Sequence, residues 1–100
     1  MTAPFDRFKN SLTNGNLWIY LLYLTKESPL PKSKVESLTF EKFGFLPGKI
    51  TCNIVLKKLE SSGYIQSKKF QGEKSYIATR EGKEELERMK DFTNNLLRKL

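Results

Sequence analysis

The segment from Pro47 to Ser62 carries the side chains with the clearest chemical potential, which is the binding of a nucleic acid. Lysine, asparagine and threonine donors suit phosphate oxygens and the edges of bases. In a major groove, asparagine could bond adenine bidentately, threonine could reach a base edge or a thymine methyl, and lysine could meet guanine or phosphate. Glu60 is the only acid of the segment. The candidate residues are Lys49, Thr51, Asn53 and Lys57.

Five further lysines could extend this surface. Lys68, Lys69 and Lys74 are expected around the tip of a hairpin, where they could contact phosphates or a minor groove. The alternative is that they only form the polar side of that hairpin. Lys32 and Lys34 begin a predicted helix, whose first N–H groups and dipole favour a phosphate. Lysine at a helix start is also common on plain surfaces.

The distribution of charge points the same way. The 100 residues carry a net charge of +7, and residues 47–76 hold six lysines against two glutamates. Basic clustering of this kind is the electrostatic footprint of a polyanionic partner. A basic surface that only keeps the protein soluble is the alternative.

Several other chemistries are disfavoured by composition. The chain has no histidine and one cysteine, which excludes the usual nucleophile–base–orienter triad and a structural zinc site. The glycines do not form a phosphate-binding loop. The longest apolar run, Leu17 to Leu24, is too short to span a membrane, and the N-terminus lacks the apolar core of a secretion signal. We therefore expect a cytoplasmic protein without enzymatic activity, cofactor, metal or membrane partner.

A helix over Pro47–Ser62 is predicted to position the first set of residues. Its apolar stripe has the spacing i, i+3, i+4 and i+7, and Pro47 and Gly48 suit its start. Gly63 suits the left-handed position that ends a helix. The stripe includes Cys52, for which a buried position is favoured over an exposed redox thiol. Its members are Cys52, Val55, Leu56 and Leu59.

Three helices are predicted before this segment, and a loop with two prolines separates the last two of them. Asn14 or Asn16 could cap the second helix. Its aromatic residues Trp18, Tyr20 and Tyr23 are expected in the core, with an effector pocket as the alternative. The predicted order is helix Pro4–Leu12, turn Thr13–Asn16, helix Leu17–Glu27, loop Ser28–Pro31, helix Lys32–Phe43 and turn Gly44–Leu46.

An extended pattern follows Gly63. The runs Tyr64–Phe70 and Ser75–Thr79 are rich in aromatic and β-branched residues and flank the connection Gln71–Lys74, which predicts a hairpin. Thr79 can cap a last helix over Arg80–Lys99.

The last helix carries apolar residues in heptad spacing. Such a seam predicts pairing with a second copy of the chain, and packing back onto Phe5 and Phe8 is the alternative. The predicted dimer interface consists of Leu86, Met89, Thr93, Leu96 and Leu100.

This order of helices and hairpin is that of a winged helix-turn-helix domain. The sequence resembles the winged-helix transcriptional regulators of the PadR and MarR type, and small archaeal and archaeal-virus winged-helix proteins look similar. The resemblance rests on VLKKLESSGYI (residues 55–65) and GEKSYIATREGK (residues 72–83). Where PadR-like recognition helices usually begin Gly-Thr-Leu-Tyr, this chain has Ile50-Thr51-Cys52-Asn53, and Lys74 stands where the wing often has arginine.

The sequence therefore predicts one mostly helical α+β domain over residues 1–100. Residues 13–79 would form a winged-helix core of three helices and a two-stranded wing, and residues 80–100 a long C-terminal dimerisation helix. The resemblance implies a homodimeric transcriptional regulator that binds double-stranded DNA sequence-specifically and acts as a repressor. The alternatives are a protein that coats DNA without sequence preference and a winged-helix module that binds an acidic protein. Whether a small-molecule effector exists is not readable from the sequence.

Overall fold

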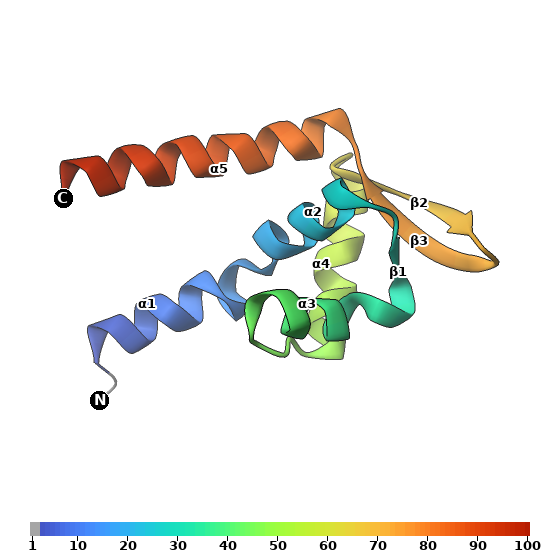
Figure 1. Ribbon diagram of the computed structural model, residues 1–100, viewed down its shortest axis with the longest axis horizontal. Helices are drawn as coiled ribbons and strands as arrows, with labels where there is room; N and C mark the ends of the chain where they lie inside the picture. The colour runs from blue at the N-terminus through green and yellow to red at the C-terminus, as the bar shows by residue number, and fades with distance from the viewer. Residues whose placement is uncertain (1–2) are drawn as a thin grey trace.

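Helix α2 (Leu17–Glu27) forms the centre of the fold, because it is apolar on nearly every side. The computed structural model describes residues 3–100. In it, α2 lies between the long helix α5 (Arg80–Lys99) and helix α4 (Lys49–Ser61) (Figure 1). The buried residues of α2 are Leu17, Leu21, Leu22, Leu24 and Thr25.

Two more helices complete the helical part, in the order that the sequence predicts. Helix α1 (Pro4–Leu12) precedes α2, and α3 (Val35–Phe43) precedes α4. The predicted helix over Lys32–Phe43 begins later, because Lys32–Lys34 form a 3₁₀ turn. The predicted central helix also begins later, at Lys49, with Pro47 and Gly48 before it. The mostly helical α+β class and the winged-helix arrangement are confirmed.

The sheet has one strand more than predicted. Strands β2 (Ile65–Phe70) and β3 (Glu73–Ala78) form the expected hairpin, and a two-residue strand β1 (Leu30–Pro31) pairs antiparallel with β3. The order is β1-β3-β2. The prediction of a loop over Ser28–Pro31 is thus wrong for Leu30 and Pro31. Proline is tolerated there because β1 is an edge strand.

The connection of the hairpin is tighter than predicted. Phe70 pairs with Glu73, so only Gln71 and Gly72 form the turn, and both have positive φ, 52° and 79°. This is the pattern of a type I′ turn, whose twist matches that of the two strands. Glu73 and Lys74 therefore belong to β3 instead of the loop.

Helix caps are partly as predicted. Gly63 has φ 83°, and the Gly63 and Tyr64 N–H groups donate to the carbonyls of Glu60 and Leu59, which is a Schellman motif. Thr79 Oγ1 accepts the Gly82 N–H at 3.1 Å and caps α5 as predicted. Neither Asn14 nor Asn16 caps α2 with its side chain, since Asn14–Asn16 form a 3₁₀ turn and Asn16 bonds Ser11 and Trp18.

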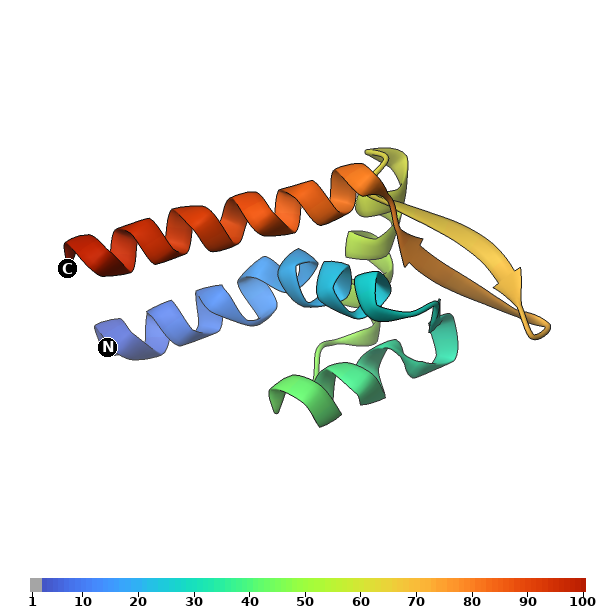
Figure 2. The same cartoon turned by 45° about the horizontal axis from the view of Figure 1, so that its top comes forward.

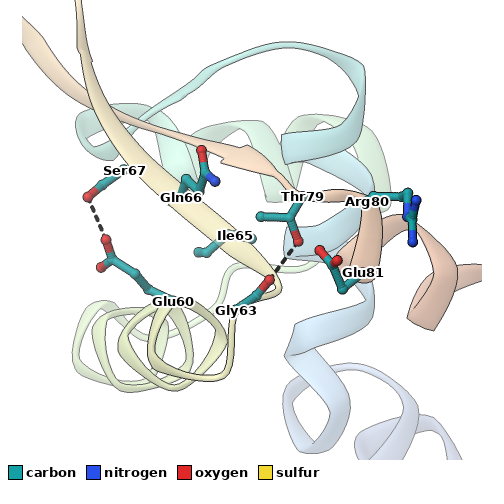
Figure 3. A pocket seen from close by; sticks show the side chains of 8 residues that line it. All are labelled: Glu60, Gly63, Ile65, Gln66, Ser67, Thr79, Arg80 and Glu81. Atoms are coloured by element: carbon teal, nitrogen blue, oxygen red, sulfur yellow. Dashed lines mark hydrogen bonds between the residues drawn. The ribbon is translucent and has the colours of Figure 1, made fainter.

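The hairpin is fixed to the helices where α4 ends and α5 begins. Thr79 Oγ1 donates to the Gly63 carbonyl at 2.6 Å, and Ser67 Oγ donates to Glu60 Oε2 at 2.5 Å (Figure 3). A cavity of about 590 Å³ lies at this junction. Because it holds two carboxylates, Glu60 and Glu81, and its one cation, Arg80, pairs with Glu84, this cavity does not suit a polyanion. It is lined by Glu60, Gly63, Ile65, Gln66, Ser67, Thr79, Arg80 and Glu81.

Candidate nucleic-acid interface

Helix α4 turns one side into the core and the other outward. Cys52, Leu56 and Leu59 are buried, and Val55 beside them is half-buried, as the stripe predicted. With 100° between successive residues, Asn53 lies on one flank of the exposed side and Thr51 roughly 160° away on the other. The four residues predicted to bind together on this helix therefore do not share one face.

A groove runs between α4, the 3₁₀ turn before α3 and the hairpin. Its larger part, about 420 Å³, is lined by both lysines and carboxylates. An adjoining part of about 240 Å³ adds Lys57. Five of the nine predicted nucleic-acid contacts meet in this groove, namely Lys32, Lys49, Asn53, Lys57 and Lys74.

The hairpin presents its lysines on two faces. Lys69 and Lys74 are direct cross-strand partners, so both lie on the face toward α4. The Lys74 Nζ lies 5.5 Å from the centre of the Tyr76 ring, a cation–π contact. Lys68 pairs with Ser75 on the other face. Lys68 and Lys69 both line a separate small pocket with Pro29, and neither lines the groove, whose wing residues Glu73, Lys74 and Tyr76 all belong to β3.

The lysines of the groove are free to bind an external anion. Among residues 3–100, the ion pairs within 4.0 Å join only residues of α5, from Arg80 to Lys90. By contrast, two carboxylates of the groove are occupied. Glu73 accepts the Ser33 N–H at 3.1 Å, and Glu60 accepts the Ser67 hydroxyl.

The bonds that Glu73 accepts also affect its charge. Hydrogen bonds from the hydroxyl and the N–H of Ser33, with Lys34 nearby, lower the pKa of the Glu73 carboxyl. Lys34 is exposed, lies close enough to influence this carboxylate, and does not line the groove itself. Glu73 therefore stays ionised at neutral pH and holds the hairpin against the start of α3.

Solved structures show the same arrangement of helices and hairpin. A PadR-family transcription regulator from Clostridium difficile matches with a TM-score of 0.68 and 24% identity, covering 82% of this chain and 94% of that one. A PadR-like transcription factor from Bacteroides fragilis matches with a TM-score of 0.73 and 17% identity, covering 93% and 94%. The chain has the PadR-type winged-helix fold.

At these identities the likeness is one of fold. No protein-family model matches the sequence, and no curated protein matches it either. The PadR-like resemblance of the motifs is confirmed for the fold, whereas the MarR-like branch and the archaeal group stay predictions. In the terms of this fold, α4 occupies the place of the recognition helix and β2–β3 form the wing.

Helix α4 also exposes two residues that the sequence analysis did not single out. Ile50 and Ile54 are 76% and 49% exposed and lie one turn apart, on the side of α4 opposite its buried stripe. The signal was present in the sequence, because an isoleucine opposite a predicted apolar stripe must face outward. It was missed because only hydrogen-bonding and charged residues were considered as binding groups.

Cys52 lies in the protein interior, as favoured, and the three aromatic residues of α2 are half-buried against the core. Cys52 is fully buried, and burial, with a smaller effect of Glu36, raises the pKa of its thiol to about 11. A thiol of this kind stays protonated and unreactive at neutral pH. Tyr20 and Tyr23 pack edge-on against Phe43, with ring centres 4.8 and 5.6 Å apart, and Trp18 packs against the core.

The predicted dimer seam needs one correction. Leu86 is 1% exposed and packs within its own chain, so it cannot contact a partner. The rest of the seam is accessible: Met89 is half-buried, and Thr93, Leu96 and Leu100 are exposed. The heptad spacing did not reveal this difference, because one apolar face runs along the whole of α5. The first half of that face packs against the core, and the second half extends past the core.

Two further searches concern the described part of the chain. Within residues 3–100, no helix combines the length and apolar character needed to cross a membrane. The same residues contain no group of three or more cysteine, aspartate or glutamate side chains arranged to hold a metal ion.

Proposed function

We propose that this chain is a homodimeric, sequence-specific regulator that binds double-stranded DNA through α4 and the wing and represses transcription without enzymatic activity. The observation that carries the proposal is the groove itself. Asn53, Lys57 and Lys74 come from two elements distant in the sequence and line one cavity. An exposed helix with unpaired lysines on both sides is what a major groove accepts. The PadR-type fold of transcription regulators supports the same function.

The dimer is supported by two unpartnered apolar faces. Helix α1 exposes Phe5, Phe8 and Leu12, and the second half of α5 exposes Phe92, Leu96 and Leu97. Both helices extend from the core toward the same end of the molecule, opposite the wing (Figure 2). A second copy would cover these faces and place two α4 helices in successive major grooves, about 34 Å apart. Occupation of a promoter by such a dimer would block transcription.

The deciding experiment is an electrophoretic shift titration on duplexes selected from a random pool. We expect the wild-type protein to prefer its selected duplex over unrelated competitor DNA at two salt concentrations. If a dimer neutralises some six phosphates, log affinity should fall against log salt with a slope of about −5. No binding of any duplex at low salt would contradict the proposal, and binding without sequence preference would favour a DNA-coating protein.

Variants assign the binding to the groove. Lys74→Gln removes two cations per dimer and should change the salt slope to about −4 while weakening all duplexes alike. Asn53→Ala should relax the preference at particular base pairs. Lys99→Gln is the matched control, because Lys99 ends α5 at the opposite end of the molecule from the wing (Figure 1). An equal effect of Lys99→Gln would show that only net charge matters.

A further inference from the structure

The exposed pair Ile50 and Ile54 is the feature of α4 that hydrogen bonding and charge do not explain. Apolar β-branched residues contribute little to an exposed helix face, because they fit a helix less well than alanine or lysine and bury nothing there. These two side chains occupy the part of the helix farthest from the core, with 76% and 49% of their surface exposed. Any partner that receives α4 meets them first.

The lysines around Ile50 and Ile54 indicate what kind of partner α4 binds. Lys57 and Lys58 flank it along the helix, and Asn53 lies between Lys49 and Lys57 on the side of the groove. An apolar partner surface would have to desolvate these lysines without compensating them. DNA compensates them with phosphates and offers one apolar group in its major groove, the C5-methyl of thymine.

We propose that Ile50 and Ile54 read thymine, by contact of their side chains with C5-methyl groups in each half-site. This inference rests on the proposed function. Four residues of α-helix rise about 6 Å, and two steps between bases on one strand span about 6.8 Å. The pair therefore matches two thymines within about two base steps. The stiff side chains of isoleucine lose little freedom on contact.

The test uses deoxyuridine, which differs from thymidine only in lacking this methyl group. In the selected duplex, each thymine is replaced singly by deoxyuridine, which keeps the base pairing and all hydrogen-bonding groups. Removal of a contacted methyl should weaken binding by the wild-type protein about fourfold per half-site, the effect of one buried methyl-sized group. Ile50→Ala and Ile54→Ala should each bind thymine and deoxyuridine equally at one of the sensitive positions.

The control is Phe40→Ala, which truncates an apolar side chain that is 56% exposed on α3, outside both α4 and the wing. It should keep the wild-type preference for thymine. Circular dichroism confirms that each variant is folded before binding is measured.

Two results would overturn the inference while leaving the proposed function intact. One is wild-type binding to the selected duplex that no deoxyuridine replacement weakens. The other is a preference for thymine that survives in both Ile50→Ala and Ile54→Ala, which would assign the reading to another residue. If the wild-type protein binds no duplex, both proposals fail, and the exposed pair would then be assigned to a protein partner.

Discussion

At the scale of single residues, Gly82 is the glycine whose surroundings leave no room for a side chain. It lies in the first turn of α5 and is buried, and a methyl group there would overlap the carbonyl oxygen of Tyr64. That carbonyl also accepts the Thr79 N–H at 3.0 Å. The close approach of α5 to the backbone just before β2 sets the position of α5 relative to the wing.

We therefore expect Gly82→Ala to destabilise the protein by about 3 kcal/mol, because backbone must move to relieve the overlap. For a domain of this size the melting temperature should fall by roughly 12 °C or more. The measurement is thermal unfolding followed by circular dichroism. Gly48→Ala is the control, since the nearest atom to its added methyl group, Thr51 Oγ1, would be 3.6 Å away. Equal melting temperatures for the two variants would contradict the argument.

Which of the predicted residues meet in the groove was only partly predictable from the sequence. Asn53 and Lys57 line it as expected, because amide and basic side chains on one side of a helix indicate a polar partner. Lys68 and Lys69 were predicted together with Lys74, but neither lines the groove, because both lie on β2 whereas the groove is bordered by residues of β3. Thr51 was grouped with Asn53 by residue type, and only their angular separation on α4 divides them.

At the scale of elements, the wing is held along its β3 strand by the segment that precedes α3. Strand β1 pairs with β3 through Leu30 and Pro31, and Glu73 accepts the Ser33 N–H just beyond that pairing. The groove exists because these contacts keep Lys74 opposite Asn53. A change at Glu73 should consequently act on the position of the wing.

We expect Glu73→Gln to loosen the junction at neutral pH and to increase exchange of the Ser33 amide hydrogen several-fold. The folded-state pKa of Glu73 is lowered, so its stabilisation is fully present above the unfolded pKa and is lost as pH falls through the folded value. The difference in melting temperature between wild type and Glu73→Gln should accordingly vanish in acid.

Hydrogen exchange followed by NMR and thermal unfolding over a range of pH would check this prediction. Glu41→Gln is the control, because Glu41 is exposed on α3 and its side chain forms no hydrogen bond or ion pair within residues 3–100. Two results would show that the Glu73–Ser33 hydrogen bond does not hold the junction. One is wild-type exchange of the Ser33 amide in Glu73→Gln, and the other is a difference in melting temperature that grows in acid.

The elements themselves were predictable where local signals define them. Helix α5 begins after its threonine cap and ends at its basic residues, as the sequence predicts. Helix α4 ends before Gly63, because the residue that terminates it adopts a left-handed backbone, which glycine allows. Strand β1 was not predictable. A strand of two residues is too short to show the alternating pattern of a β-strand. The partners of Leu30 and Pro31 are also more than forty positions away, in β3. The type I′ turn was missed because it usually contains Asn-Gly or Asp-Gly instead of Gln71-Gly72.

At the scale of the whole molecule, the shape is elongated, with extents of 46 × 29 × 22 Å. The long axis arises because α1 and α5 continue past the three-helix core, away from the wing (Figure 1). The face that buries Leu86 in the core continues along α5 to Leu96 and Leu100, which are exposed. The second copy of the proposed dimer would cover the half of this apolar face that the chain leaves exposed.

We expect Leu96→Glu to convert the proposed dimer into a monomer, because two carboxylates would be buried in an apolar interface. Asn95→Glu is the matched control. It introduces the same charge one position away, on the exposed polar side of α5. Sedimentation equilibrium should give the mass of two chains for wild type and Asn95→Glu, and 11.6 kDa for Leu96→Glu.

DNA binding distinguishes loss of the dimer from loss of the fold. A folded Leu96→Glu monomer keeps α4 and the wing, so it should bind one half-site with a salt slope of about −2.7, half that of a dimer contacting six phosphates. It should also lose the preference for two half-sites one helical turn apart. If wild type itself sediments as a monomer, or if Leu96→Glu remains a dimer with full affinity, the exposed face of α5 does not join two copies.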